Sequence, residues 1–413
     1  MPKFLHLADI HLGFDRYDSP ERTKDFFFAL QDVIEKYAIG ESVDFVVIAG
    51  DLFEHRMIQP AVLNQAQLCL QTLQACNIPV LAIEGNHDNR PYGTKTSWLR
   101  YLSDWGLLKL LEPGNVAAGE SFYSAWDGKR GGYIDLDCGV RVLGSNWYGA
   151  AAPRAIEQIA AAMATLPGGP QQTVLLFHHG LEGQIARYAG ALRYNDLLPL
   201  QAAGVDYLAL GHIHKHYAVE NWVFNPGSLE ANNVEESGFE RGVLLVSLDS
   251  TGVQADLKTD YQQRPIVRLR LTAKGQESIE ELGEAAIATL DQANLPPEPQ
   301  PIVELRIDGQ VGFDRLELDT RALQQALQTR SNALIFLLKY DVDEVGYAVP
   351  MEEEANRLHI EQTVFTDLLA ANNVYKKRAD QLAQGLIDIK DRQLSGQAEE
   401  DIYTVVETLL EIE

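Results

Sequence analysis

The chain has 413 residues, with 34 Lys and Arg against 59 Asp and Glu, and its net charge at pH 7 is therefore −25. This acidic balance argues against diffuse binding to nucleic acid, but it leaves room for a local basic groove, because local fields steer ligands. With 46% hydrophobic and 23% charged residues, the composition is that of a globular protein and argues against a largely disordered chain. At about 150 residues per domain, the length predicts two or three domains.

The cysteine content and the length of the apolar runs indicate in which cellular compartment the protein is expected. Three cysteines without a CxxC pair exclude a disulfide framework and a cysteine zinc site, and they are typical of a reducing cytoplasm. No stretch approaches the roughly 18–20 apolar residues of a membrane span, and the N-terminus reaches Asp9 too early for a secretion signal. We therefore expect a cytoplasmic protein that does not enter a membrane.

The first part of the chain alternates short apolar runs with amphipathic stretches. Buried strands are predicted where the runs are rich in Val, Ile, Leu and Phe, at residues 4–8, 44–49, 79–83, 173–177 and 205–210. Helices are predicted at 23–38 and 60–76, and a further strand at 243–248. Strands that alternate with helices predict an α/β domain, here over residues 1–262.

The pattern changes after residue 262. Half-buried strands are predicted at 267–271, 302–307 and 336–340, with a helix at 277–292, so residues 263–350 are interpreted as a small α+β domain. Residues 351–413 are strongly charged and helical in pattern, and we expect a group of C-terminal helices there.

Five of the predicted strands run directly into polar residues of related chemistry. Ligands of α/β sheets lie beyond the carboxyl ends of parallel strands, so these side chains are expected to meet at one edge. The candidate metal ligands are Asp9, His11, Asp51, Asn86, His178, His212 and His214. Seven donors are too many for one ion and suit two, with Asp51 shared between them. Glycines before Asp51, Asn86 and His212 would allow tight turns and leave space for a ligand.

Carboxylate, amide and imidazole ligands without thiolate suit Mn, Fe or Zn better than Ca or Mg. Two such ions about 3.5–4 Å apart suit the hydrolysis of a phosphoester. His87 need not bind metal; it is the candidate catalytic residue, protonating the leaving oxygen, with Asp88 orienting its ring. The alternative for His87 is a supporting role without chemistry. His6 and His216 are expected to be ordinary core histidines, and His179 to point away from its neighbour His178.

These motifs together resemble the calcineurin-like metallophosphoesterases. Their surroundings, at residues 7–13, 48–53 and 83–88, are similar to the SbcD / meiotic-recombination-eleven nucleases of DNA double-strand-break repair. The resemblance is close over residues 1–230 and looser over the small domain, which is similar to the DNA-contacting capping domain of that family.

The resemblance implies a four-layer αββα sandwich that binds two manganese ions, with iron, zinc or magnesium as the alternative ions. Asp9, His11, Asp51 and His214 would hold one ion, and Asp51, Asn86, His178 and His212 the other. It implies a metal-dependent phosphodiesterase that acts as a 3′→5′ exonuclease on duplex DNA and as an endonuclease on single strands. The implied partner is an SbcC-type coiled-coil ABC ATPase, and the implied location is the cytoplasm, at the nucleoid. The C-terminal helices are expected either to dock on this ATPase, as in the family, or to pack back on the small domain.

One position departs from the family. Many relatives have a histidine directly after the Asp-Leu-Phe that contains the bridging aspartate, whereas this chain has Glu54 there and His55 one step later. Because that histidine is implicated in exonuclease action, the balance of exonuclease and endonuclease cutting is open. His55 either substitutes for it through a loop adjustment or lies in solvent.

Basic loop residues beside the motifs are candidate DNA contacts, with ordinary solvated charge as the alternative. The candidates are Arg16, His55, Arg90 and Lys95. The helix at 23–38 carries apolar residues on more than one face, among them Phe26, Phe27 and Phe28. A surface helix usually needs one apolar stripe. The excess is expected either to meet the 60–76 helix of a second copy in a homodimer or to be buried within one chain.

Two other functions remain open from the sequence. One is a phosphoesterase for a small or protein phosphate ester, against which the long chain beyond the first domain argues. The other is a non-catalytic scaffold at DNA ends, against which the intact set of seven ligands argues.

Overall fold

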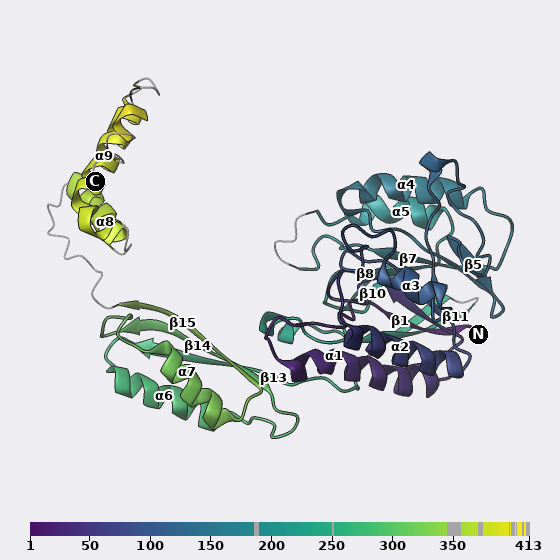
Figure 1. Ribbon diagram of the computed structural model, residues 1–413, viewed down its shortest axis with the longest axis horizontal. Coiled ribbons are helices and arrows are strands. Elements are labelled where there is room, and N and C mark those ends of the chain that lie inside the picture. Colours follow the sequence, from purple (N-terminus) through teal and green to yellow (C-terminus); the bar gives the residue numbers. More distant parts are fainter. Residues whose placement is uncertain are drawn as a thin grey trace. The chain divides into compact units, whose positions relative to one another are not determined.

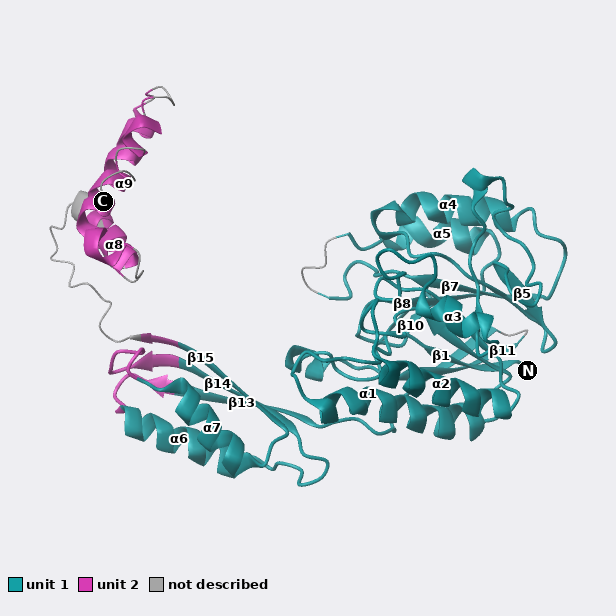
Figure 2. Cartoon of the chain, in the orientation of Figure 1, with its two compact units in different colours: residues 1–272, 279–308, 318–341 teal, residues 273–278, 309–317, 342–413 magenta. Residues whose placement is uncertain are grey.

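The computed structural model describes residues 1–185, 190–249, 252–344, 357–370 and 375–395, together with 397, 401, 403–406 and 409. The chain divides into two compact units (Figure 2). The first unit comprises residues 1–272, 279–308 and 318–341, and the second comprises 273–278, 309–317 and 342–413. The predicted division at residues 262 and 350 stays a prediction.

The first unit contains two six-stranded mixed sheets (Figure 1). The first sheet consists, in spatial order, of β12 (Gly252–Lys258), β11 (Val243–Asp249), β1 (Lys3–Leu7), β2 (Phe45–Ala49), β3 (Val80–Ile83) and β4 (Lys109–Leu110). The second consists of β5 (Tyr133–Leu136), β6 (Val140–Leu143), β7 (Gln172–His178), β8 (Tyr207–Gly211), β10 (Val223–Asn225) and β9 (Tyr217–Val219). Strands β1–β4 are parallel, and so are β6, β7, β8 and β10.

The two sheets pack face to face around a shared apolar core. Phe4 and Phe45 of the first sheet stack with ring centroids 4.7 Å apart, and Tyr207 of the second sheet meets the edge of Phe4 at 5.1 Å. Each outer face is covered by its own helices, with a separate core beneath them. The four-layer αββα sandwich is therefore confirmed.

Helices are present at both places in the sandwich where the sequence predicted them, residues 23–38 and 60–76. The first sheet is covered by α1 (Pro20–Val33), which continues as the π-helix η1 (Ile34–Ile39), by α2 (Pro60–Ala75) and by α3 (Trp98–Asp104). The second is covered by α4 (Ala152–Met163) and α5 (Tyr194–Ala202). Ser19 caps α1 by accepting from the amide of Arg22, and prolines open both α1 and α2, where a missing N–H costs nothing. Short helical turns are η2 (Val116–Ala118), η3 (Gly149–Ala151) and η4 (Val234–Gly238).

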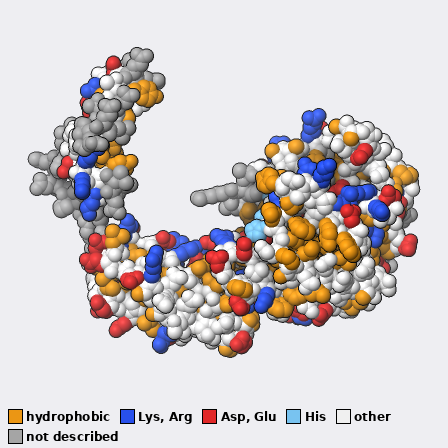
Figure 3. Space-filling view, in the orientation of Figure 1, with side chains coloured by type: hydrophobic (Ala, Val, Ile, Leu, Met, Phe, Trp, Pro, Cys, Tyr) orange, Lys and Arg blue, Asp and Glu red, His pale blue; other side chains and the backbone are white. Residues whose placement is uncertain are grey.

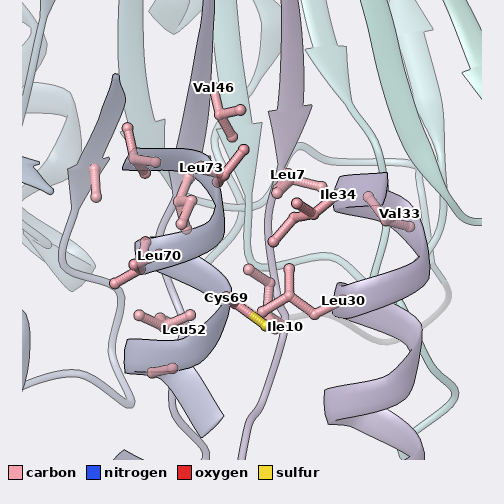
Figure 4. Close-up of a cluster of buried hydrophobic side chains, with 14 of the residues drawn as sticks. Leu7, Ile10, Leu30, Val33, Ile34, Val46, Leu52, Cys69, Leu70 and Leu73 are labelled. Atoms are coloured by element: carbon pink, nitrogen blue, oxygen red, sulfur yellow. The ribbon is translucent and has the colours of Figure 1, made fainter. Parts of the chain in front are cut away.

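Most of the apolar surface of α1 and α2 is used inside the chain. Leu30 and Ile34 belong to the same buried cluster as Leu70 and Leu73, and all four pack over residues of the first sheet (Figure 4). Hydrophobic side chains nevertheless gather on the surface over α2 and α3 (Figure 3). The exposed large hydrophobic side chains of the chain include Phe28 of α1 and Leu68 of α2, with 39% and 47% of their surface accessible. Burial within one chain thus accounts for most of the apolar excess, but not for these side chains.

A three-stranded sheet follows the sandwich in the chain. Its order is β13 (Ile266–Lys274), β14 (Ile302–Val311) and β15 (Ile335–Glu344), and its helices are α6 (Ile279–Gln292) and α7 (Thr320–Ser331). The sequence did not predict α7, which is polar and whose buried side chain is Leu327. The C-terminal elements are α8 (Arg357–Ala370), the turn η5 (Lys376–Arg378) and α9 (Ala379–Leu394). Across the described residues, no helix has both the length and the apolar character needed to cross a bilayer.

Candidate metal centre

The five polar strand ends meet at one edge of the sandwich, but they come from two sheets rather than one. Strands β1, β2 and β3 of the first sheet lead to Asp9, Asp51 and Asn86, and strands β7 and β8 of the second lead to His178 and His212. Both carboxylate oxygens of Asp9 accept the backbone N–H of His212, at 3.0 and 2.9 Å. The carboxyl ends of the two sheets are therefore in direct contact.

The first donor cluster consists of Asp9, His11 and His214, whose ligand atoms lie within 4.8 Å of one another. Nε2 of His11 is 3.1 Å from Nε2 of His214. Two nitrogen ligands about 2.1 Å from one ion, at right angles to each other, would lie about 3 Å apart. The spacing of these two imidazoles thus fits a shared cation.

The second donor cluster consists of Asp51, His178 and His212. Nε2 of His178 lies 3.2 Å from Oδ2 of Asp51 and 3.1 Å from Oδ1 of Asn86, so the predicted amide ligand is beside this cluster. Nδ1 of His178 is 2.7 Å from the carbonyl oxygen of Ala49, which can only accept a proton. The proton of a neutral His178 ring is therefore held on Nδ1, and Nε2 is free to bind a cation.

The backbone around the clusters is strained. Positive φ angles, which L-residues rarely adopt, occur at four candidate ligands, namely Asp9 (51°), His11 (53°), Asp51 (55°) and His212 (83°). Such strain is concentrated at functional sites, because only the surrounding structure can maintain it. A Cβ on Gly85 would lie 2.1 Å from Oδ1 of Asp51, and a Cβ on Gly50 would lie 2.3 Å from Nδ1 of His178. The glycines leave the space that the sequence predicted.

Charge is balanced within the site. Burial alone would lower the pKa of His178, but the charge of Asp51 beside it raises that pKa to about 9. Burial would raise the pKa of Asp51, yet His178 outweighs this and holds it well below its ordinary value. Burial would also lower the pKa of His214, but the hydrogen bond to Glu236 and the charges of Glu236, Asp9 and Asp51 together raise it to about 9. Asp51 is therefore ionised at neutral pH, the form that a cation requires.

The candidate catalytic residue His87 lies beside both clusters and is partly exposed. Its backbone N–H donates to Oδ1 of Asp51 at 2.8 Å, and Nδ1 of its ring lies 2.6 Å from the carbonyl oxygen of Glu54. Asp88 does not contact this ring through any hydrogen bond of the structure. Its buried carboxylate instead accepts the backbone N–H groups of Leu52, Phe53 and Gly85. The expected support of the His87 ring by Asp88 is thus provided by Glu54, and Asp88 holds the loops together.

Two glutamates beside the candidate metal ligands were not predicted from the sequence. Glu236 lies 3.2 Å from Nδ1 of His214, and Glu54 lies 2.7 Å from Nδ1 of His11. No spacing rule indicates Glu236, which is brought in by the turn η4. Glu54 was noted as a departure from the family, but its contact with His11 was not foreseen. His55 pairs with Asp15 at 3.0 Å, with about half of its side chain exposed, and it joins neither cluster.

The remaining predicted residues fall into two groups. Arg16, Arg90 and Lys95 are exposed on loops, and none of them forms an ion pair with another residue that the structure describes. His6 is buried between the hydroxyl of Tyr207, at 2.8 Å, and the carbonyl of Leu210, at 3.0 Å, as expected of a core histidine.

Comparisons with known proteins agree with this geometry. The family described as calcineurin-like phosphoesterase matches residues 2–216, more than half of the chain. The "DNA double-strand break repair protein Mre11" of Archaeoglobus fulgidus is 32% identical over 57% of this chain and 52% of its own length. The protein of the same name from Haloferax volcanii is 26% identical over 97% of this chain and 86% of its own. The "Uncharacterized metallophosphoesterase YhaO" of Bacillus subtilis is 28% identical over 63% and 60%.

The Archaeoglobus protein and two further proteins of the same name, from Methanosarcina mazei and Methanosarcina acetivorans, are matched over only 52%, 44% and 59% of their own length, so the chain spans about half of them. The family match, by contrast, contains the strand ends that carry all seven candidate ligands. On this evidence the chain belongs to the calcineurin-like phosphoesterase family.

Proposed function

We propose that the chain is a two-metal DNA nuclease of double-strand-break repair. One observation carries the proposal: donors from two sheets form two adjoining clusters, each with the ligand spacing of a cation site. The names of the archaeal relatives, which include one matched over 97% of this chain, support DNA repair as the setting. Manganese is the proposed ion, because the ligands are mixed oxygen and nitrogen donors without thiolate; iron, zinc and magnesium are the alternatives.

We assign the candidate residues to two roles, the binding of the two ions and the donation of a proton. Asp9, His11, Asp51 and His214 would hold one ion, and Asp51, Asn86, His178 and His212 the other. Bound divalent ions supply Lewis acidity at the phosphate and an activated water nucleophile. Because Nδ1 of His87 donates to the carbonyl of Glu54, Nε2 is the ring atom left to face the substrate. When Nε2 is protonated, it donates its proton to the leaving oxygen of the phosphodiester.

The substrate would be duplex DNA for 3′→5′ exonuclease cutting and single strands for endonuclease cutting. The exposed charges of Arg16, Arg90 and Lys95 are the proposed phosphate contacts, together with His55. Reversing Arg90 and Lys95 to Glu is expected to weaken DNA binding while metal content stays unchanged. Equal affinity of the variant and the parent at low salt would remove this part of the proposal.

Two assemblies belong to the proposal. An SbcC-type coiled-coil ABC ATPase is the proposed partner, bound through the C-terminal helices. A second copy of the chain is the proposed occupant of the surface that exposes Phe28 and Leu68. The variants Phe28→Glu and Leu68→Glu are expected to convert a dimer to a monomer in sedimentation. A wild-type chain that sediments as a monomer at micromolar concentration would contradict the dimer.

One experiment separates the nuclease from its rivals. The full chain is incubated with Mn²⁺, end-labelled DNA and bis-p-nitrophenyl phosphate, with and without an SbcC-type ATPase, beside His87→Ala. We expect cleavage of DNA that His87→Ala abolishes without loss of metal. Cleavage of the small ester alone would favour a phosphoesterase for small substrates. Metal binding without turnover of either substrate would favour a DNA-end scaffold.

A further inference from the structure

Glu54 contacts both His11 and His87, although the sequence offers it as a mere departure from its family. Oε2 of Glu54 lies 2.7 Å from Nδ1 of His11. Both atoms are buried, and neither makes a hydrogen bond to any residue in the described part of the chain. The carbonyl oxygen of the same residue lies 2.6 Å from Nδ1 of His87. One residue thus faces the same ring atom of two histidines at the candidate centre.

The protons on these rings account for both contacts. Nε2 of His11 faces Nε2 of His214 at 3.1 Å, in the first donor cluster. A neutral imidazole that binds a cation through Nε2 carries its single proton on Nδ1. Among the residues that the structure describes, Glu54 alone is placed to accept that proton, and accepting it would satisfy both buried atoms. A further cation between Nδ1 and Glu54 is disfavoured, because His11 would then have to lose both ring protons.

The main chain holds Glu54 in place for this role. Its backbone N–H donates to the carbonyl of Leu12 at 3.0 Å, one residue beyond His11. The side chain is mostly buried, with 17% of its surface accessible, so its charge acts on the ring of His11 with little screening by water. The contact therefore belongs to a fixed segment and not to a freely moving surface side chain.

The second cluster is built differently. His214 of the first cluster also has a carboxylate at Nδ1, that of Glu236 at 3.2 Å. In the second cluster, Nδ1 of His178 meets the neutral carbonyl of Ala49. A carboxylate raises the electron-donor strength of an imidazole more than a carbonyl does, and such outer partners typically change metal affinity about 10–100-fold. Both histidines of the first cluster thus have charged support, whereas His178 has neutral support.

We propose that Glu54 is a positioning residue that strengthens cation binding at Asp9, His11 and His214. Its carboxylate fixes the proton and the orientation of the His11 ring, and its carbonyl does the same for His87. The two clusters are therefore unequal, and the first depends on Glu54 while the second does not. This inference rests on the proposed metal centre, but not on the identity of the substrate.

The test is a calorimetric titration of the full, metal-stripped chain with Mn²⁺. Wild type is expected to show two binding steps. Glu54→Ala is expected to weaken one step about 10–100-fold and to leave the other within about twofold. Glu54→Gln, which keeps the shape but loses the charge, is expected to weaken the same step by a smaller factor, and Glu236→Gln should affect that step too. Glu41→Gln, which removes an exposed carboxylate paired with Lys3, is the matched control.

The outcomes separate this inference from the proposed function. Two unchanged steps in Glu54→Gln and Glu54→Ala would overturn the role of Glu54, and so would equal weakening of both steps. If Glu54→Ala does not fold, Glu54→Gln decides alone. The long-range ¹H–¹⁵N spectrum of histidine-labelled, Zn²⁺-loaded chain gives a second readout: a ring proton on Nε2 of His11 would overturn the inference. A wild type that binds no cation would instead refute the metal centre itself.

Discussion

The two sheets of the sandwich contribute different chemistry to the candidate centre. The ends of β1, β2 and β3 provide every oxygen donor, namely Asp9, Asp51 and Asn86, with a single imidazole, His11. The ends of β7 and β8 provide imidazoles alone, from His178, His212 and His214. Each donor cluster draws on both sheets. Neither sheet alone carries either of these two clusters, so the proposed binding of cations by them depends on how the two sheets dock.

The largest effect on cation binding is expected from substitution of Asp51, the residue of the first sheet that is proposed to bind both ions. Asp51→Ala removes the proposed shared carboxylate, and we expect loss of both cations and a fall in DNA hydrolysis of at least about 10²–10³-fold. Elemental analysis of the purified chain gives the metal count. The control is Asp256→Ala, an exposed aspartate of β12 that pairs with Lys258. Retention of two ions by Asp51→Ala would show that the sheets do not share this ligand.

The next effect tests whether sheet docking sets the metal site. Phe45→Ala opens the core between the sheets, and Phe26→Ala opens the core beneath α1, since both side chains are fully buried. Each is expected to lower the free energy of unfolding by about 3–5 kcal/mol in urea titrations. Only Phe45→Ala is expected to weaken Mn²⁺ binding as well. If the two variants weaken binding equally, the docking of the sheets has no special role.

Metal removal should weaken the link between the sheets. A ligand present at 100 times its Kd stabilises the folded state by about 2.7 kcal/mol, so chelation should lower the melting temperature by several degrees. His178→Ala, which removes a ligand of the second sheet, should reduce the difference between loaded and chelated protein. Calorimetric melting with Mn²⁺ and with a chelator measures it. A difference that is the same in wild type and His178→Ala would speak against a cation held between the sheets.

The smallest effect concerns His6, a histidine of the first sheet that contacts Tyr207 and Leu210 of the second sheet and is not a candidate metal ligand. Burial lowers the pKa of His6 to about 3, below its ordinary value of 6.5. Its stabilisation is therefore complete above about pH 6.5 and is lost progressively as the pH falls, by about 1.4 kcal/mol per unit. His6→Gln does not titrate there, so the advantage of wild type should shrink by about 2 kcal/mol between pH 7.5 and 5. Urea titrations of chelated protein at both pH values measure this. A constant difference would contradict a neutral His6.

The sequence predicted the individual strands better than it predicted how they divide between the two sheets. The apolar runs before Asp9, Asp51, Asn86, His178 and His212 predicted five strands, and all five are present. Their division between two sheets was reached only through the resemblance to a family. Parallel buried strands look alike in sequence whichever sheet they join, because both faces are covered. Short strands such as β9, at the edge of the sheet, and β10 beside it have too few residues to show a pattern.

The contacts of the site were the least predictable part. The seven candidate ligands were named from their place at strand ends, and the structure brings them together. Glu236 reaches His214 from 22 positions away through a short turn, and no local pattern encodes that approach. Asp88 was expected beside the ring of His87, but its carboxylate is used by three backbone N–H groups. Adjacent residues in a tight loop point in different directions, which spacing alone does not reveal.

Beyond the ends of β1 and β2, the two loops continue side by side through backbone hydrogen bonds. Asp9 donates to Gly50, Ile10 and His11 donate to Asp51, and Leu12 donates to Leu52. Inserting or deleting one residue in either loop would shift this pairing and carry a ligand away from its partners. We therefore expect natural insertions and deletions to occur in other loops of the chain and not in these two. Engineered chimeras of this chain should exchange residues 3–12 and 45–54 only as a pair.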